Sequence, residues 1–360
     1  DTFGNTTNSK VGIEWQPIDD LLLRATWSEG FRAPSISELF AGQGDSFPTI
    51  TDPCNGLDTD GDGLADTNPG LPGCGGVPGT YFQAKAQIRI TVGSNPNLTP
   101  ETSDSVTFGF VYSPSWLDGL DITVDYYNIE LDNTITTLGP QTILNTCSNT
   151  GTTLCNLIQR DSLGIVRDLL AAGTNIGGTE VEGVDFLVSY SFPETDWGFF
   201  RVVWDGAYQG KNEDTVLSND GVSFTTVSNL GFNLGDGAFT RWKSNLDLNW
   251  SYGDWEATWG MQYIHATAES CAIPAAFGFC NLDFDGDGDP SDARQIGGTT
   301  YHDAQVSYFL SEYDTRLTVG VQNIGDKNPP LSTTAFANSF NVADYRTPGR
   351  FPYVRVTVDF

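Results

Sequence analysis

The chain has 360 residues, of which 46 are acidic and 17 basic, and its formal net charge at pH 7 is -29. This balance excludes nucleic acid as a partner, because neutralising phosphates requires many Lys and Arg side chains, and it favours divalent cations instead. Methionine occurs once, whereas Gly (40), Phe (22), Tyr (13) and Trp (9) are plentiful, so the composition favours strands and turns over helices and predicts an all-β protein. No apolar run reaches about eighteen residues, which excludes a transmembrane helix but leaves a barrel of half-apolar strands open.

The chain alternates between apolar and polar residues from its first segment to its last. In 11–16, for example, Val11, Ile13 and Trp15 share one face of the predicted strand and the polar residues share the other. The polar faces of these segments carry Asp, Asn, Thr, Gln and Arg, which suit a wet lumen better than a soluble core. Eleven segments show the pattern: 11–16, 21–28, 106–113, 120–127, 184–192, 199–209, 245–252, 255–263, 304–310, 317–321 and 353–360.

Short and long connections between these segments alternate strictly. Every second connection is a tight turn between two consecutive strands, for example 17–20, 114–119 and 193–196. The other connections are far longer than usual: about seventy residues follow Phe31, and 132–177 contains a predicted short helix near 141–145. In a membrane barrel these would be the periplasmic turns and the extracellular loops. Aromatic residues near strand ends would form the interfacial girdles: Trp15, Trp27, Tyr112, Tyr126, Trp250, Tyr252, Trp255 and Phe360.

The six cysteines form three local pairs, all in the long connections. We predict disulfides between Cys54 and Cys74, Cys147 and Cys155, and Cys271 and Cys280, formed in an oxidising compartment.

Three stretches also resemble a known family. Residues 27–40 read WSEGFRAPSISELF, residues 95–103 read NPNLTPETS, and residues 321–327 read VQNIGDK. Together with a terminal Phe360, they are similar to the barrel of TonB-dependent outer-membrane receptors. The resemblance implies a 22-stranded barrel in the bacterial outer membrane, occluded by an amino-terminal plug, so residues 1–360 are expected to form its carboxy-terminal part, without the plug and the first half of the barrel.

The resemblance also implies partners. They are outer-membrane lipid, a TonB-type energy-coupling protein that acts through the missing amino-terminal part, and the outer-membrane assembly machinery, which would read Phe360. The expected function is energy-coupled uptake of a scarce solute ligand: a metal chelate, cobalamin or an oligosaccharide. An odd number of strands cannot close into an antiparallel barrel, which supports the expectation of a fragment.

Two acidic loops contain candidate cation-binding motifs. Their carboxylates recur at every second position and precede a glycine, a spacing that lets side-chain oxygens converge on one hard cation. Calcium is the predicted ion, although neither loop ends as an EF-hand does, and an acidic solvated turn is the alternative. The first loop contributes Asp58, Asp60, Asp62 and Asp66, and the second contributes Asp283, Asp285 and Asp287.

Other residues give weaker signals. The aromatic residues Phe40, Phe47, Tyr81 and Phe82 lie in a predicted outer loop, where they could touch a ligand. No nucleophile elbow or Ser-His-Asp arrangement is present, so no enzyme activity is expected. A second hypothesis is a secreted, calcium-stabilised β-sandwich or adhesion module, in which the apolar faces would pack against each other. A requirement for detergent would distinguish the two.

Overall fold

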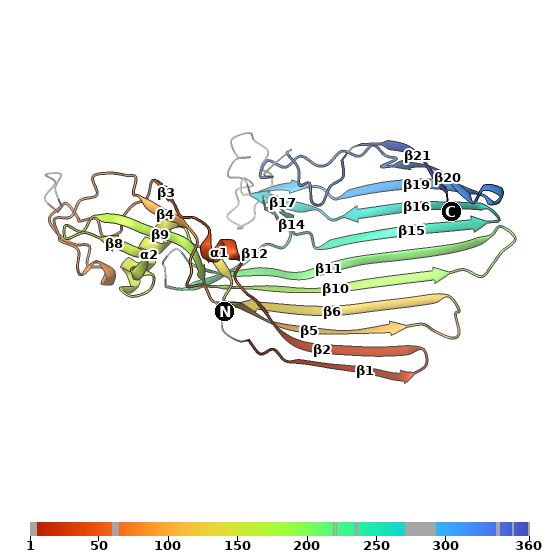
Figure 1. Ribbon diagram of the computed structural model, residues 1–360, viewed down its shortest axis with the longest axis horizontal. Coiled ribbons are helices and arrows are strands. Elements are labelled where there is room, and N and C mark those ends of the chain that lie inside the picture. Colours follow the sequence, from red (N-terminus) through yellow and green to blue (C-terminus); the bar gives the residue numbers. More distant parts are fainter. Residues whose placement is uncertain are drawn as a thin grey trace.

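Eleven long strands of the computed structural model follow one another in chain order across one antiparallel sheet (Figure 1). The structure describes residues 6–59, 65–218, 220, 222–234, 237–270, 293–335, 339–347 and 349–358. Within them, the sheet path confirms the eleven predicted strands, and a short strand β12 (Phe224–Ser228) pairs with β11 beside it. The eleven are β1 (Lys10–Ile18), β2 (Leu21–Arg32), β5 (Glu101–Tyr112), β6 (Leu120–Asp132), β10 (Gly178–Ser191), β11 (Phe199–Leu217), β15 (Trp242–Tyr252), β16 (Trp255–Ile264), β19 (Thr299–Leu310), β20 (Thr315–Gln322) and β21 (Phe351–Val358).

The strand register separates an apolar face from a polar face. Leu23 pairs with Phe110, which pairs with Val124, which in turn pairs with Phe186, so one row of apolar side chains crosses four strands. Such cross-strand rows stabilise a sheet. Ile13 at 65% and Val354 at 67% exposure show that this face is not packed against a second sheet. The β-sandwich alternative therefore receives no support.

The polar face holds charges in the same register. The next row begins at Arg24, which pairs with Gly109. Gly109 pairs in turn with Asp125, and Asp125 pairs with Asp185. The Arg24 guanidinium binds the Asp125 carboxylate, and Gly109 leaves room between them, since a Cβ there would lie 2.1 Å from Asp125 Oδ1. If one strand shifted by one residue against its neighbour, its apolar side chains would move to the polar face. The alternation in the sequence therefore fixes the register of the paired strands.

Figure 1 shows all the short turns at one end of the sheet and the long connections at the other. Turn residues in the left-handed region, among them Gly119 (φ 86°), Gly198 (φ 103°) and Gly253 (φ 55°), allow the tight reversals. This confirms the predicted alternation of short turns and long connections, which places the two kinds at opposite ends of the sheet.

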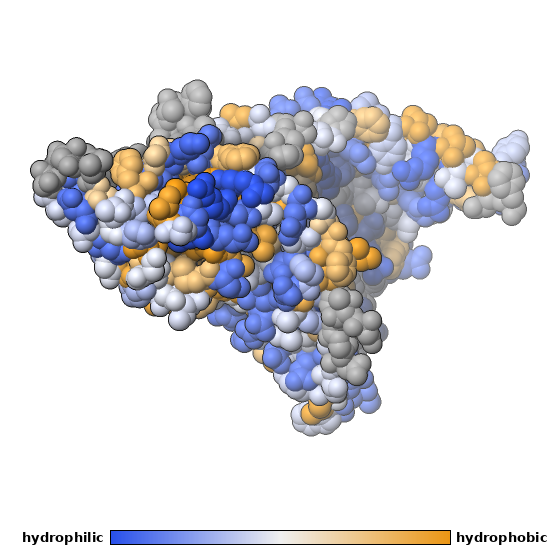
Figure 2. All heavy atoms as spheres, turned by 60° about the vertical axis from the view of Figure 1, so that its left-hand side comes forward, coloured by the Kyte–Doolittle hydropathy of each residue, from blue (hydrophilic) through white to orange (hydrophobic). Residues whose placement is uncertain are grey.

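The sequence predicted one short helix in the two longest connections, and the structure adds paired strands to them. Their strands pair across the chain in the order β3-β4-β9-β7, with β8 beside β9, and β4 and β9 run parallel. We call 33–100 together with 133–177 the loop layer; it extends beyond the ends of the long strands (Figure 1), and most of its visible face is hydrophilic (Figure 2). Its elements are α1 (Ile36–Phe40), β3 (Gly44–Ser46), η1 (Pro72–Cys74), β4 (Ile90–Gly93), β7 (Ile135–Thr137), α2 (Pro140–Thr150), η2 (Cys155–Leu157), β8 (Ile158–Arg160) and β9 (Val166–Asn175).

Helix α2 confirms the predicted short helix but is longer. Pro140 occupies its first turn, where the missing N–H costs nothing, and Gly151 ends it with φ 72° and an N–H that donates to the carbonyl of Cys147. Its apolar side buries Ile143 and Leu144, which pack with Leu169 of β9 in the core of the loop layer. The loop layer thus has a small hydrophobic core of its own.

Two of the three predicted disulfides are confirmed. Cys54 and Cys74 are bonded with Cα atoms 5.3 Å apart, and Cys147 and Cys155 with Cα atoms 4.8 Å apart. Cys271 and Cys280 lie outside the described residues, as does Phe360.

The remaining short elements lie in the later connections. No helix among the described residues has the length and hydropathy that a membrane span requires. These elements are β13 (Asn233–Leu234), β14 (Gly237–Ala238), β17 (Thr267–Ser270), β18 (Ala293–Ile296) and η4 (Ser311–Tyr313).

Candidate functional site: a basic and aromatic cavity

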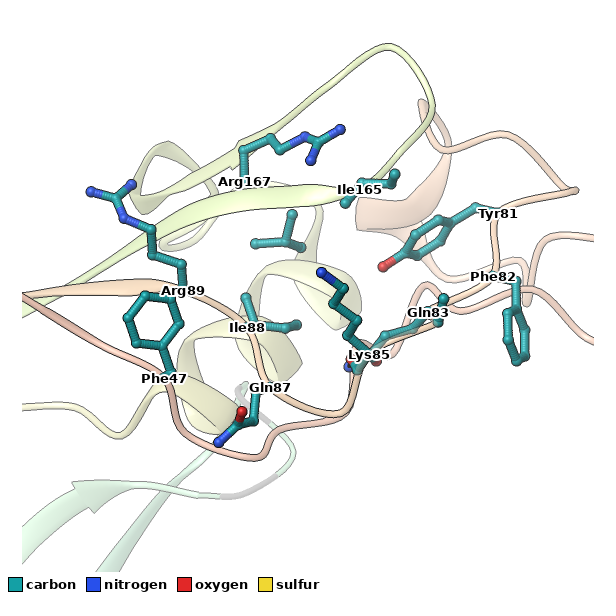
Figure 3. Close-up of a pocket in the computed structure, with 12 residues that line it drawn as sticks. Phe47, Tyr81, Phe82, Gln83, Lys85, Gln87, Ile88, Arg89, Ile165 and Arg167 are labelled. Atoms are coloured by element: carbon teal, nitrogen blue, oxygen red, sulfur yellow. The ribbon is translucent and has the colours of Figure 1, made fainter.

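The loop layer contains a cavity of about 530 Å³ between the segment that precedes β4 and the start of β9. Lys85 extends into the middle of the group of lining residues in Figure 3, with the Tyr81 ring beside it. Three of the four aromatic residues that the sequence indicated line this cavity, and Phe40 does not. The lining residues are Phe47, Tyr81, Phe82, Gln83, Ala84, Lys85, Gln87, Ile88, Arg89, Ile165, Val166 and Arg167.

The charged side chains of the cavity are all cations, in a chain with a net charge of -29. Among the described residues, Lys85 forms no ion pair. Arg89 binds Asp45 at 2.8 Å and Asp168 at 3.6 Å, and these contacts, that with Asp45 first, raise the pKa of Arg89; Arg167 binds Asp161 at 2.6 Å. The Arg89 and Arg167 side chains are 45% and 62% exposed, and ion pairs of exposed side chains contribute little stability. An anionic ligand can therefore compete for these cations at small cost.

A buried ion pair holds Tyr81, a residue of the cavity lining, in place. Asp52, whose side chain has no exposure, accepts a hydrogen bond from Arg160 Nη2 at 2.8 Å and another from the Tyr81 hydroxyl at 3.0 Å. Burial, followed by the charge of Asp52, raises the pKa of the Tyr81 phenol well above its usual value. The hydrogen bond of its hydroxyl to Asp52 fixes the ring, which gives the lining a stable aromatic wall.

The sequence indicated the aromatic residues but not the cations. Lys85 and Arg89 are four positions apart, and Arg167 joins them only because β9 folds back against this segment. The signal present in the sequence was the local excess of positive charge in a strongly acidic chain.

The first acidic loop is only partly described. Leu57 and Thr67 form an isolated bridge, which closes the loop at its base, and Asp66 Oδ2 accepts hydrogen bonds from the Thr59 N–H at 2.8 Å and the Thr59 hydroxyl at 2.7 Å. Asp60 and Asp62 lie outside the described residues, as do Asp283, Asp285 and Asp287 of the second loop. Within the described ranges, no three His, Cys, Asp or Glu side chains are grouped as metal ligands. The calcium prediction therefore stays a prediction.

The comparisons with known proteins agree with this architecture. The family model described as "TonB dependent receptor-like, beta-barrel" matches residues 1–324, and no curated protein matches the sequence. A variant of the ferric enterobactin receptor of Pseudomonas aeruginosa is similar in structure, with a TM-score of 0.60 and 16% identity over 100% of this chain and 41% of that one. The siderophore receptor PirA of Acinetobacter baumannii gives a TM-score of 0.58 and 12% identity over 100% of this chain and 42% of that one. At these identities the likeness concerns the fold, and this chain spans about two-fifths of the length of those receptors.

Proposed function

The chain belongs to the TonB-dependent receptor-like β-barrel family of the bacterial outer membrane, and we propose that it forms part of the wall of a receptor that takes up an anionic metal chelate. The cavity carries this proposal, because it gathers three cations and three aromatic rings on the loop side of an otherwise acidic chain.

The two faces of the sheet support a position in the membrane wall. The exposed apolar face suits lipid, and the polar face, with ion pairs such as Arg24 with Asp125, suits a water-filled lumen. All long connections leave from one end of the sheet, which we assign to the outside of the cell. Energy coupling through a TonB-type protein, an occluding plug and further strands of the wall remain proposals that rest on the family. The family is one of receptors, and we propose no catalytic activity.

The charge and the aromatic rings of the cavity favour one class of solute over the others. Cobalamin and neutral oligosaccharides carry too little negative charge to need Lys85, Arg89 and Arg167 together. A ferric catecholate has both negative charge and aromatic rings, so it would use charge-assisted hydrogen bonds and stacking or cation–π contacts in one site. The names of the two structural neighbours given above, a ferric enterobactin receptor and a siderophore receptor, support this class.

We also propose that the loop from Asp58 to Asp66 binds calcium. The Leu57–Thr67 bridge holds both ends of the loop together, and the Cys54–Cys74 disulfide encloses it. Both constraints lower the entropy that the loop loses when its carboxylates gather around an ion.

Uptake of radioactive iron tests the proposed function. Cells that lack the gene should lose accumulation of a ferric catecholate under iron limitation, and the gene in trans should restore it. Unchanged uptake of catecholate, trihydroxamate and citrate complexes in the deletion strain would reject a role in iron chelate uptake.

A further inference from the structure

The last long connection, between β20 and β21, returns to the polar face of the sheet. We call residues 339–347 the strap. Tyr345 of the strap is 4% exposed and packs against Ile264 and Tyr301, which are each 1% exposed. Ile264 pairs in register with Lys243, and Tyr301 pairs with Gln262, so both lie on the face that carries the charged rows. The strap therefore covers the polar wall at its loop end.

Two ion pairs fasten the strap to this wall, one from each side of Tyr345. Asp344 binds Lys243 of β15, and its Oδ2 also accepts the N–H of Ala238 at 3.1 Å. Arg346 Nη1 binds Asp303 Oδ2 of β19 at 2.6 Å, and the guanidinium lies over the Tyr301 ring at 5.5 Å from its centre. Asp303 also accepts the Asn323 N–H at 2.7 Å, which ties the strap to the end of β20. The strap is thus held by one aromatic anchor and two charged contacts.

Solvent reaches the ion pairs of the strap, although its aromatic anchor is buried. Arg346 and Asp303 are 39% and 33% exposed, so water and salt reach this pair from both sides, whereas they reach the other pair through Lys243, which is 46% exposed, because Asp344 is only 9% exposed. Lys243 also borders a recess of about 400 Å³ in the wall, which Asp185 and Asp205 line as well. A released Lys243 would face these two carboxylates, and this lowers the cost of losing Asp344.

We propose that the strap is a releasable gate on the lumenal wall, closed in this structure, which uncovers the wall around Ile264 and Tyr301 when the pairs of Asp344 and Arg346 break. The inference rests on the proposal that the polar face lines a transport path. Closed and open positions would differ by little free energy, as switching segments require.

Thiol labelling tests the gate without measuring uptake. Ile264→Cys would be introduced into the full-length receptor in isolated outer membranes, and its reaction with a small charged maleimide timed. Labelling should be slow in this parent and about threefold to tenfold faster when Asp344→Asn and Arg346→Gln are added, the population change expected from losing two ion pairs that solvent reaches. Raising NaCl from about 0.05 M to about 1 M should accelerate labelling of the parent in the same direction, because salt screens both pairs.

Arg24→Gln is the matched control, because it removes an ion pair from the same polar face at a distance from the strap, and it should leave the labelling rate unchanged. If Ile264→Cys does not fold, as judged by its mobility in unheated gels, Thr299→Cys replaces it as the reporter, because Thr299 pairs with Ile264 on the same face and is 1% exposed. Fast labelling in the parent would show that the strap does not cover the wall, and equal slow rates in all variants would show that it does not open. Either result overturns the gate and leaves chelate uptake to be judged by its own test.

Discussion

Asp52 and Arg160 lie 108 positions apart in the sequence and meet in a buried ion pair. The Asp52 carboxylate has no solvent exposure and also accepts the Cys54 N–H at 3.0 Å, while Arg160 Nη1 donates to the carbonyl of Gly164 at 2.9 Å. The pair joins the two long connections of the loop layer and contacts Tyr81 of the cavity lining. It therefore couples the stability of the loop layer to the shape of the cavity.

Replacing Asp52 by Asn should loosen the loop layer and leave the long strands intact. The substitution leaves the Arg160 guanidinium buried without its counterion, which costs about 3–5 kcal/mol in local stability. Hydrogen exchange should speed up in 44–93 and 158–175 and not in β5 or β6. Arg167→Met, which breaks the exposed pair with Asp161, is the matched control and should change exchange little. Equal effects of the two substitutions would contradict a structural role for the buried pair.

Alkaline pH should weaken the same region through Tyr81. Its pKa is raised in the folded state above the ordinary value of 10.0, because the phenol is buried beside Asp52. A raised folded pKa gives stability that is fully present below the unfolded pKa and is lost as pH rises above it, since the unfolded chain ionises first. Protease cleavage between Cys54 and Cys74 should therefore increase above about pH 10.

Tyr81→Phe separates this effect from other alkaline titrations. The variant should start about 0.5–1.5 kcal/mol less stable, because it loses the hydrogen bond to Asp52, and its pH dependence above about pH 10 should be shallower than that of the wild type. Parallel pH profiles for the two proteins would show that the phenol does not titrate as argued.

The two faces of the long strands should respond differently to charge. Val124→Arg or Phe186→Arg places a cation on the exposed apolar face and should cost roughly 2–4 kcal/mol near the bilayer midplane. Leu248→Arg should behave in the same way. The neighbouring substitutions Thr123→Asn and Asp185→Asn lie on the polar face and should be tolerated. Folding into lipid vesicles measures both sets, and similar losses on the two faces would count against the membrane orientation.

Calcium should protect the loop that begins at Asp58. Cleavage between Cys54 and Cys74 should slow with added calcium, with half-saturation anywhere up to about 1 mM, the range of extracellular sites. Asp60→Ala should abolish the protection, whereas Asp20→Ala, in a turn at the opposite end of the sheet, should retain it. Identical cleavage with calcium and with chelator would mean that the loop is an acidic turn.

The sequence predicted the long strands because their signal is local. Alternation along a single strand, such as Val354, Val356 and Val358, is visible without knowing the neighbouring strands. Strand ends were less predictable: β11 continues to Leu217, well past the apolar alternation, because polar cross-strand contacts such as Lys211 with Glu180 (2.8 Å) extend the pairing. Local disulfide pairing was likewise visible in the spacing for the two pairs that the structure describes.

The loop layer could not be read in this way. Its strands have as few as three residues, too short to show a period, and the parallel pairing of Thr91 with Leu170 joins segments far apart in the chain. The cavity has the same origin, because Arg167 approaches Lys85 only after β9 has docked. The strap was missed too, since its docking depends on charges from three separate segments. The sequence identified aromatic residues in the loops, but it could not show that three of them line one cavity.

Equilibrium binding of a ferric triscatecholate to the purified receptor tests the central claim most directly. Lys85→Gln, Arg89→Gln and Arg167→Gln should each weaken binding roughly tenfold, since each removes a charge-assisted contact, and Arg24→Gln on the barrel wall should not. An uncharged ferric trihydroxamate of similar size should bind weakly and respond little to these substitutions. If the triscatecholate binds with unchanged affinity when all three cations are neutralised, the cavity is not the chelate site.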